Sequence, residues 1–313
     1  MRDLAARGVH VYGYNRSGAG ARAANDAGFD ASDDLADTLR RAEEDKALIV
    51  MAAPMPAIPG MLDAIVDHAP SCGFTDVVSV KAEVYALVKE RGLQDRYVGG
   101  HPMAGTADSG WSASQEGLFT RAAWVITYDH APDASDEWIS LWTDVVRMIL
   151  AVGADAIPAR VDHHDAAVAR ISHLVHVFAE TLAIVGDNGG ALAQSLAAGS
   201  FRDSTRVAGT QPSLVRAMCE TNADAVVVAL GEALELLNDA RASLAKPRPD
   251  ISQLADAGYA ARIRFEARHG ARGESVSPVK ISSRPLLRLH PGAAGWVSQL
   301  VQAESLGARI DIF

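Results

Sequence analysis

The feature that most constrains the fold is an alternation of short apolar runs with helix-forming segments in the first half of the chain. Runs typical of buried strands occupy residues 9–14, 47–53, 76–80, 97–100 and 124–127. Helix formers dominate residues 19–27, 57–68 and 82–92 between them. Strands that alternate with helices in this way predict an α/β domain, in which crossover helices cover a parallel sheet.

The second half of the chain has a different texture. Residues 161–245 are rich in Ala, Leu, Val and Glu, with apolar residues at three- and four-residue intervals, which predicts helices. A chain of 313 residues with 49% hydrophobic composition also exceeds the usual size of one domain. We therefore expect an α/β domain over residues 1–153, a helical domain over 154–245 and a C-terminal extension of unknown role over 246–313, with one short strand at 284–290.

Composition argues against several classes of function. The formal net charge is -10 and no block of five basic residues occurs, which disfavours a nucleic-acid surface. The two cysteines, Cys72 and Cys219, lack the spacing of a metal site. No apolar run of membrane-spanning length and no signal-peptide pattern is evident, so we expect a cytoplasmic protein that does not enter a membrane.

Residues 9–17 have the form of the second strand of a dinucleotide-binding unit. An acidic residue at the end of that strand favours NAD, whereas a neutral residue followed by arginine suits the additional phosphate of NADP. The chain has Asn15, Arg16 and Ser17 at this place, which favours NADP with NAD as the alternative. An ordinary turn with a solvated arginine fits the spacing equally well.

Residues 1–8 resemble the end of the helix that follows the first strand of such a unit. The preceding strand and its G-x-G-x-x-G turn, which brings backbone N–H groups to the pyrophosphate, do not precede them in this sequence. We therefore expect a Rossmann-like domain that is truncated at its N-terminus, with Met1 an internal methionine of a longer natural chain.

The sharpest local signal is the sequence G-G-H-P-M-A-G at residues 99–105, directly after a predicted strand. Ligands bind at the carboxyl ends of parallel strands, so His101 is a candidate for catalysis. Ser79, in S-V-K, occupies the equivalent place after another predicted strand. A single His-Pro turn is more often structural.

Two histidine-bearing motifs are predicted on one continuous helix, H-H-D at residues 163–165 and S-H-L-V-H at 172–176. Ser172 and His176 are four residues apart and share a helix face. His164, His173 and His176 together are potential zinc ligands, but no cysteine completes the set, and we predict no metal site.

The segment F-R-D-S-T-R at residues 201–206 contains a cation near an acid. The guanidinium of Arg206 is suited to hold a substrate carboxylate through two parallel hydrogen bonds. A surface ion pair, which stabilises a fold by about 0–1 kcal/mol, is the simpler interpretation of Arg206 and Asp203.

Taken together and in order, these motifs make residues 1–245 resemble the prephenate/arogenate dehydrogenase family. The resemblance rests on S-V-K at 79–81, G-x-H-P-M-A-G at 99–105, the H-D and S-H-L-x-H helix, and F-x-D-x-T-R at 201–206. The chain departs from the family pattern in its first eight residues and at Val175, where a proline is usual.

The resemblance implies a nicotinamide-dependent oxidative decarboxylation of prephenate to 4-hydroxyphenylpyruvate in tyrosine biosynthesis. His101 matches the catalytic histidine of the family, and Ser79 would share the ring hydroxyl of the substrate. The substrate would also contact Arg206, His176, Asp203 and Ser172. The cofactor, NADP or alternatively NAD, would contact Asn15, Arg16, Ser17, Ala53 and Pro54. The resemblance also implies that the helical domain forms a homodimer.

Three alternatives remain open. No motif separates prephenate from arogenate, whose amino group replaces the side-chain ketone. A β-hydroxyacid or imine reductase has a similar plan but would carry a helix-borne lysine, and residues 161–238 contain none. A cofactor-free relative that acts as a binding protein would account for the first eight residues, although retention of His101, Ser79 and Arg206 argues against it.

Overall fold

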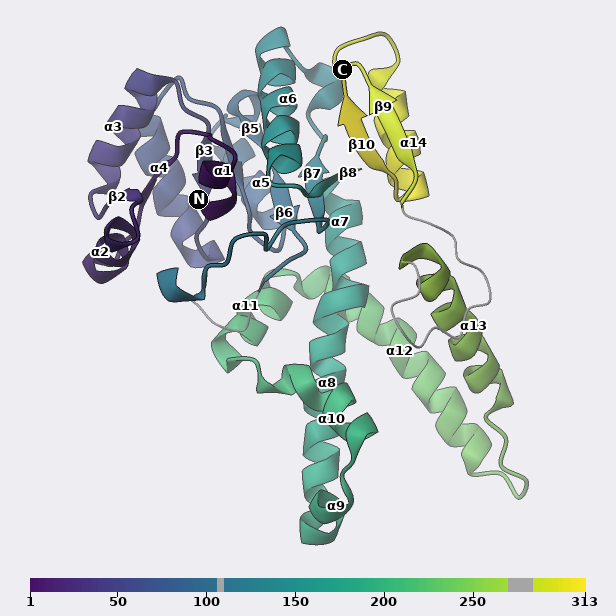
Figure 1. The fold of residues 1–313 in the computed structure, drawn as a ribbon. Coiled ribbons are helices and arrows are strands. Elements are labelled where there is room, and N and C mark those ends of the chain that lie inside the picture. The colour runs from purple at the N-terminus through teal and green to yellow at the C-terminus, as the bar shows by residue number, and fades with distance from the viewer. Residues whose placement is uncertain (106–109, 270–283) are drawn as a thin grey trace. The chain divides into compact units, whose positions relative to one another are not determined.

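The computed structural model describes residues 1–105, 110–269 and 284–313 of the chain. These residues form two compact units, one of Met1–Asp165 with Leu286–Phe313 and one of Ala166–Pro285 (Figure 1). The boundary expected at residue 153 stays a prediction, and the division between these two units falls after Asp165. Residues 155–159 form a strand, β8, that pairs with a strand of the first unit, and this pairing keeps them out of the helical unit.

The first unit contains two groups of parallel strands. Strands β1 (Tyr12–Tyr14) and β2 (Asp30–Ser32) pair with each other, and β3 (Ile49–Met51), β4 (Phe74–Asp76) and β5 (Tyr97–Val98) form a separate parallel sheet. The predicted α/β architecture with a parallel sheet is confirmed. The strand predicted at residues 76–80 is misplaced, because β4 spans Phe74–Asp76. It ends there because the Asp76 carboxylate accepts a hydrogen bond from the Val78 N–H, and this bond turns the chain.

Helices connect these strands as expected for parallel pairing. In chain order, the first six α-helices of this unit are α1 (Arg2–Ala6), α2 (Gly18–Asp26), α3 (Leu35–Asp45), α4 (Ile58–His68), α5 (Ala82–Glu90) and α6 (Asp136–Ala151). Side-chain oxygens of Ser17, Asp34 and Ser135 accept hydrogen bonds at the N-termini of α2, α3 and α6. The predicted helices at 19–27, 57–68 and 82–92 correspond to α2, α4 and α5.

The first unit also holds a mixed sheet of order β6-β7-β8-β10-β9. Its strands are β6 (Gly100–Pro102), β7 (Ala123–Thr127), β8 (Asp155–Ala159), β9 (Leu286–Leu289) and β10 (Arg309–Ile312). Pairing is antiparallel for β6 with β7 and β8 with β10, and parallel for the other neighbours. The strand expected at 284–290 is β9, so the end of the chain extends this sheet.

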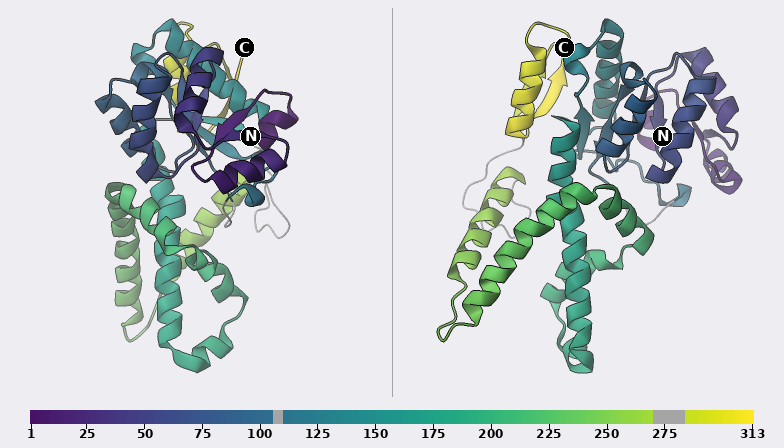
Figure 2. Two further views of the ribbon diagram at one scale, coloured as in Figure 1. Left: turned by 90° about the vertical axis from the view of Figure 1, so that its left-hand side faces the viewer. Right: turned by 180° about the vertical axis from the view of Figure 1, so that it is seen from behind.

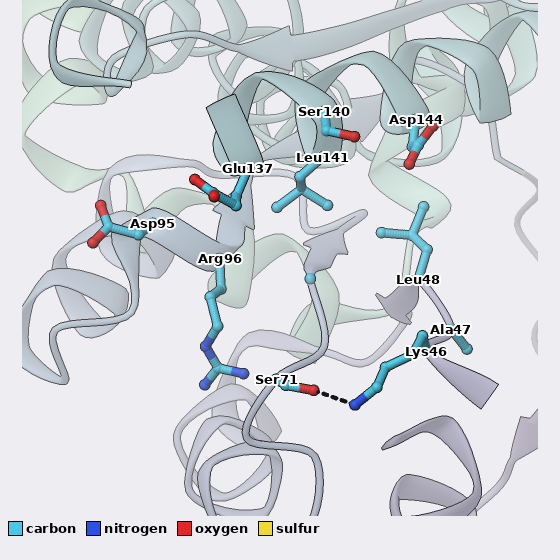
Figure 3. Close-up of a pocket in the computed structure, with 11 residues that line it drawn as sticks. Lys46, Ala47, Leu48, Ser71, Asp95, Arg96, Glu137, Ser140, Leu141 and Asp144 are labelled. Atoms are coloured by element: carbon cyan, nitrogen blue, oxygen red, sulfur yellow. Dashed lines mark hydrogen bonds between the residues drawn. The ribbon is translucent and has the colours of Figure 1, made fainter. Parts of the chain in front are cut away.

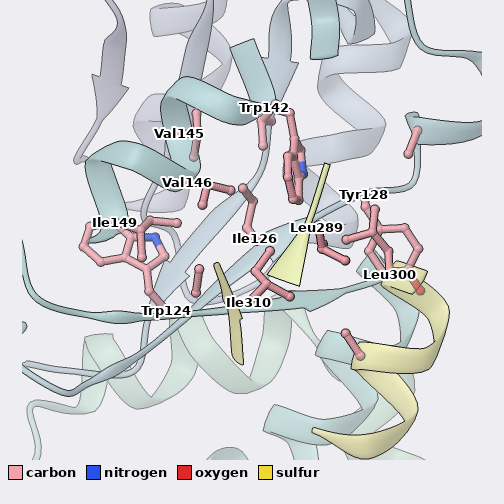
Figure 4. Packing of buried hydrophobic residues seen from close by; sticks show 14 of the residues in the cluster. Trp124, Ile126, Tyr128, Trp142, Val145, Val146, Ile149, Leu289, Leu300 and Ile310 are labelled. Atoms are coloured by element: carbon pink, nitrogen blue, oxygen red, sulfur yellow. The ribbon is translucent and has the colours of Figure 1, made fainter. Parts of the chain in front are cut away.

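The C-terminal residues complete a hydrophobic core (Figure 4). Helix α14 (Trp296–Leu306) follows β9 and precedes β10 in the chain. Its Leu300 is fully buried in the same core cluster as Ile310 of β10. Trp142 and Ile149 of α6 belong to the same cluster, with Trp124 and Ile126 of β7. The extension expected over residues 246–313 is thus not one segment, because residues 286–313 belong to the core of the first unit.

The second unit is helical (Figure 2). Its elements are α8 (Leu174–Asn188), α9 (Gly190–Leu196), α10 (Gly199–Thr205), the 3-10 helix η6 (Arg206–Gly209), α11 (Pro212–Thr221), α12 (Ala223–Leu244) and α13 (Ser252–His269). Helix α7 (Val161–Val168) runs from one unit into the other and continues into α8 through a π-helical turn, Ala169–His173. The helix predicted through these residues is continuous, but the wider turn changes the faces that four-residue spacing predicts.

Much apolar surface of the second unit is exposed. On α12, Val227, Leu234, Leu237 and Leu244 are each 47–68% exposed and lie near one face of the helix. The run Val161–Asn188 has the length and composition of a membrane-spanning helix, with 22% of its most apolar window buried, although no such segment was expected. A core helix or an interface helix of a soluble protein has the same properties.

The place of Ile310 in the core predicts the effect of truncating its side chain. Ile310→Ala should lower the free energy of unfolding by about 2–5 kcal/mol, because it leaves a cavity against α6 and β8. Val301→Ala, at a position 40% exposed on α14, should change it by less than about 0.5 kcal/mol. Urea denaturation followed by tryptophan fluorescence measures both values. Equal stability of the Ile310→Ala variant and the parent would contradict the assignment of β10 to this core.

Candidate active site

A buried ion pair joins the carboxyl end of β4 to the first residues of β5 and β6. The Lys81 ammonium contacts the Asp76 carboxylate at the end of β4, and both side chains are fully buried. Lys81 Nζ also donates to the Gly100 carbonyl oxygen at 2.7 Å, and the Tyr97 hydroxyl donates to Asp76 Oδ2 at 2.6 Å. Burial lowers the pKa of Lys81 while Asp76 opposes that change, and burial together with Asp76 raises the pKa of Tyr97.

The two glycines before His101 allow the chain to pass close to the end of β4. A Cβ atom on Gly100 would lie 2.8 Å from the Asp76 carbonyl oxygen and 3.0 Å from Trp124 Nε1. His101 itself lies on β6, opposite Val125 of β7, and is not part of a turn. The glycines therefore allow close packing that fixes the histidine on a strand.

His101 contacts a second histidine that is almost completely buried. His101 Nδ1 lies 2.9 Å from His164 Nε2, and the two rings meet edge to face with centroids 5.1 Å apart. His164 is 3% exposed, and its Nδ1 lies 2.7 Å from Asp165 Oδ1. A chain of hydrogen bonds thus runs from Asp165 through His164 to His101.

The Asp165 carboxylate also binds the start of helix α5. It accepts hydrogen bonds of 2.8 Å from the backbone N–H groups of Lys81 and Ala82. Burial tends to raise its pKa, but the hydrogen bonds from His164 and from these two N–H groups outweigh burial and lower it. A carboxylate at a helix N-terminus is further stabilised by the helix dipole, so Asp165 is ionised at neutral pH.

These contacts join the segments that carry two of the residues that the sequence singles out, Ser79 and His101. Ser79 is half-buried and lies between Asp76 and Lys81, the residues that bind each other. Lys81 reaches Gly100, next to His101, with its side chain, and reaches Asp165 with its backbone N–H. The segment containing Ser79 and the strand containing His101 are therefore fixed by one network.

The expected substrate-binding residues of the helical half all lie in the second unit. Ser172 falls within the π-helical turn, His176 lies on α8, Asp203 lies on α10 and Arg206 begins η6. Helix α8 packs against both α10 and η6. Among the described contacts, the buried Nδ1 of His176 has no hydrogen-bond partner, and no ion pair joins the exposed side chains of Asp203 or Arg206.

Two of the three histidines considered as zinc ligands make other contacts. His164 binds Asp165 and His101, whereas the His173 ring lies 3.2 Å from the Asn222 amide. Within the described ranges, no group of three or more potential ligand side chains is arranged to hold a metal ion.

The residues expected to meet the cofactor lie at the carboxyl ends of β1 and β3. Asn15 Oδ1 accepts a hydrogen bond from the Ser17 N–H, and Ser17 caps helix α2. Arg16 between them is exposed, and no ion pair of the described residues involves it. Ala53 and Pro54 follow β3.

Asn15, Arg16 and Ser17 supply an amide, a cation and a hydroxyl at a strand end, and these groups fit the adenosine ribose of a nicotinamide dinucleotide. Residues 1–8 contain a single glycine, so no pyrophosphate contact is assigned to them.

A hollow elsewhere in the first unit has a volume of about 240 Å³ and mixed charge (Figure 3). Lys46 and Ser71 line it from segments before β3 and β4, together with Arg96, Glu137 and Asp144. It therefore lies at the amino ends of the parallel strands, whereas ligands of open parallel sheets bind at the carboxyl ends. We do not assign this hollow to the active site.

Sequence reasoning gave no role to Lys81 or Asp165 and considered His164 only as a metal ligand. The sequence feature that could have indicated His164 and Asp165 is the H-D pair at 164–165. Its meaning depends on the contacts with His101 and with the start of α5, which are distant in sequence.

Comparisons with known proteins agree with this arrangement. Residues 2–155 match the family model of the prephenate dehydrogenase nucleotide-binding domain, and residues 160–257 match that of the prephenate dehydrogenase dimerization domain. A solved structure of a candidate prephenate dehydrogenase from Corynebacterium glutamicum is 60% identical, with a TM-score of 0.94 over 100% of this chain and 94% of that one.

Two curated relatives extend the comparison. Cyclohexadienyl dehydrogenase of Zymomonas mobilis is 30% identical over 74% of this chain and 77% of its own. Prephenate dehydrogenase of Bacillus subtilis is 29% identical over 62% of this chain, which spans 53% of that relative, or about half its length. Together, the two domain matches and these relatives show that the chain belongs to the prephenate dehydrogenase family.

Proposed function

We propose that the protein is a prephenate dehydrogenase that converts prephenate to 4-hydroxyphenylpyruvate with NADP in tyrosine biosynthesis. The observation that carries this proposal is the fixed position of His101, on a strand beside the Ser79 segment and in contact with the buried His164. A histidine held in this way is suited to accept a proton from a substrate hydroxyl near neutral pH.

The reaction removes a hydride and carbon dioxide from the substrate ring. When bound, the nicotinamide cofactor supplies the hydride acceptor. His101 accepts a hydrogen bond from the ring hydroxyl, so that the carbon bearing it gains ketone character as the hydride leaves. Loss of the ring carboxylate as carbon dioxide then makes the ring aromatic, and the proton that His101 accepted returns to the phenol oxygen.

Other residues bind and orient the substrate in this proposal. Ser79 shares the ring hydroxyl with His101, and Arg206 holds a carboxylate through charge-assisted hydrogen bonds. His176, with a buried Nδ1 that lacks a partner among the described residues, contacts the substrate side chain. Ser172 and Asp203 support this part of the site.

Arogenate is the second candidate substrate. The similarity to cyclohexadienyl dehydrogenase at 30% identity supports testing it beside prephenate. A cofactor-free binding protein is the remaining alternative. We distinguish the three by adding each substrate with NADP or NAD and following absorbance of the reduced cofactor; prephenate turnover supports the proposal, whereas arogenate turnover alone or no turnover contradicts it.

Replacing the base should affect turnover much more than binding. His101→Asn should reduce kcat by about 10²–10⁴-fold with a small change in KM, because asparagine cannot accept the proton. In the parent enzyme, activity should fall as pH drops through the pKa of His101, since only the neutral ring is a base. His68→Asn, at the end of α4, is the matched control. A higher KM with unchanged kcat in His101→Asn would refute the assigned role.

The proposed preference for NADP depends on Arg16. Arg16→Ala should weaken NADP binding by about 10- to 100-fold, because a charge-assisted hydrogen bond to the ribose phosphate is lost, and should leave NAD binding almost unchanged. Arg22→Ala, on the exposed face of α2, is the control. Calorimetric titration with both dinucleotides measures the effect, and an equal loss for both would count against NADP recognition by Arg16.

We also propose that the second unit forms a homodimer and that the protein is cytoplasmic. The match to a dimerization domain and the exposed apolar residues of α12 support the homodimer, and they offer an explanation for the apolar Val161–Asn188 run without a membrane. Cys72 and Cys219 form no disulfide, which is consistent with a reducing compartment.

The α12 surface gives a direct test of the homodimer. The parent should sediment at twice the chain mass of 33.0 kDa, and Leu234→Asp should shift it toward the monomer, because a charge is costly in an apolar interface. Leu234→Met should remain dimeric. A monomeric parent at micromolar concentration would rule the proposal out.

A further inference from the structure

We infer that His164 and Asp165 are positioning residues that hold His101 in the tautomer whose Nε2 carries the lone pair. This inference deepens the proposed function, since that function requires His101 to act as a base. It rests on three successive contacts whose donors and acceptors can be assigned from the chemistry of each group.

The direction of the chain begins at Asp165. Its carboxylate accepts hydrogen bonds from two backbone N–H groups, of Lys81 and Ala82, which can only donate. Those same bonds lower its pKa against the effect of burial, so it has no proton to give at neutral pH. The 2.7 Å contact with His164 therefore requires a proton on Nδ1 of His164.

The next contact transmits this assignment to His101. A neutral His164 with its proton on Nδ1 has a lone pair on Nε2, and that atom lies 2.9 Å from Nδ1 of His101. His101 must then donate from Nδ1, which leaves the lone pair on Nε2. His164 is 3% exposed, so its ring makes these two contacts away from bulk water.

His164 and Asp165 also favour the protonated state that His101 reaches when it takes up a proton. An imidazolium donates more strongly to His164 than a neutral ring, and the Asp165 carboxylate stabilises the positive charge through His164. The neighbouring charged groups, Lys81 and Asp76, form their own buried pair, and Lys81 Nζ is directed to the Gly100 carbonyl. Asp165 is therefore the anion connected to His101 by hydrogen bonds through His164.

Two substitutions at position 164 separate the two functions of its ring. The amide oxygen of glutamine can take the place of Nε2, so His164→Gln retains an acceptor for His101. Asparagine is shorter, so His164→Asn can still donate to Asp165 but cannot reach His101. Glutamine thus replaces the ring atom that faces His101, and asparagine the one that faces Asp165. Thermal unfolding shows whether each variant is folded.

The test is long-range ¹H–¹⁵N NMR of the histidine rings in the full chain without cofactor or substrate. The His101 signals are identified by their loss in His101→Asn. The parent should show His101 with its proton on Nδ1, as should His164→Gln, whereas His164→Asn should lose this preference and show a lower His101 pKa. A proton on Nε2 of His101 in the parent, or identical tautomer and pKa in His164→Asn, would overturn the inference.

Kinetics provides a second arm. His164→Asn should lower kcat by about 10- to 100-fold, shift the acidic limb of the kcat/KM profile to lower pH and leave KM nearly unchanged, whereas His164→Gln should recover part of the rate. An unshifted acidic limb would indicate a structural role only. The NMR measurement needs no turnover, so the two proposals can fail separately. If the protein converts neither substrate but His101 still carries its proton on Nδ1, the proposed function is refuted and the inference about His101 stands.

Discussion

The buried pair of Lys81 and Asp76 is the interaction on which the arrangement of the first unit most depends. Two charges removed from water are tolerated only when their remaining hydrogen bonds are satisfied, and here the Tyr97 hydroxyl and the Gly100 carbonyl satisfy them. Removal of one partner from such a pair typically costs about 3–5 kcal/mol. The pair therefore fixes the ends of β4, β5 and β6 relative to one another, and it places the Ser79 segment beside the strand that carries His101.

A second anion, Asp165, connects this scaffold to the candidate base. It accepts hydrogen bonds from two backbone N–H groups at the start of α5 and from one ring N–H of His164. One carboxylate therefore fixes the position of both a helix N-terminus and a histidine. The rigid support is important because a general base contributes to catalysis only when its lone pair is aligned with the substrate proton. The same unit gains further support from the C-terminal strands, since Ile310 and Leu300 pack with Trp142 in its core.

Several features were predictable from local sequence, and others were not. Periodicity located α2, α4 and α5, because helix formation depends mainly on neighbouring residues. The run at 76–80 looked like a strand because it is apolar, but pairing and the turn at Asp76 decided the register of β4. The extent of the first unit has a similar cause: β8 belongs to it through its pairing with β7, a distant contact that composition does not report.

The sequence by itself determined the fold class, the family resemblance and the identity of His101, Ser79 and Arg206 as candidate site residues, because these depend on periodicity and on short motifs. Only the tertiary structure decided the partners of His101. His164 lies 63 positions away along the chain, and Asp165 meets Lys81 across 84. Contacts over such separations are set by the packing of whole elements, so the hydrogen-bond chain that orients the histidine emerges only when the unit is folded.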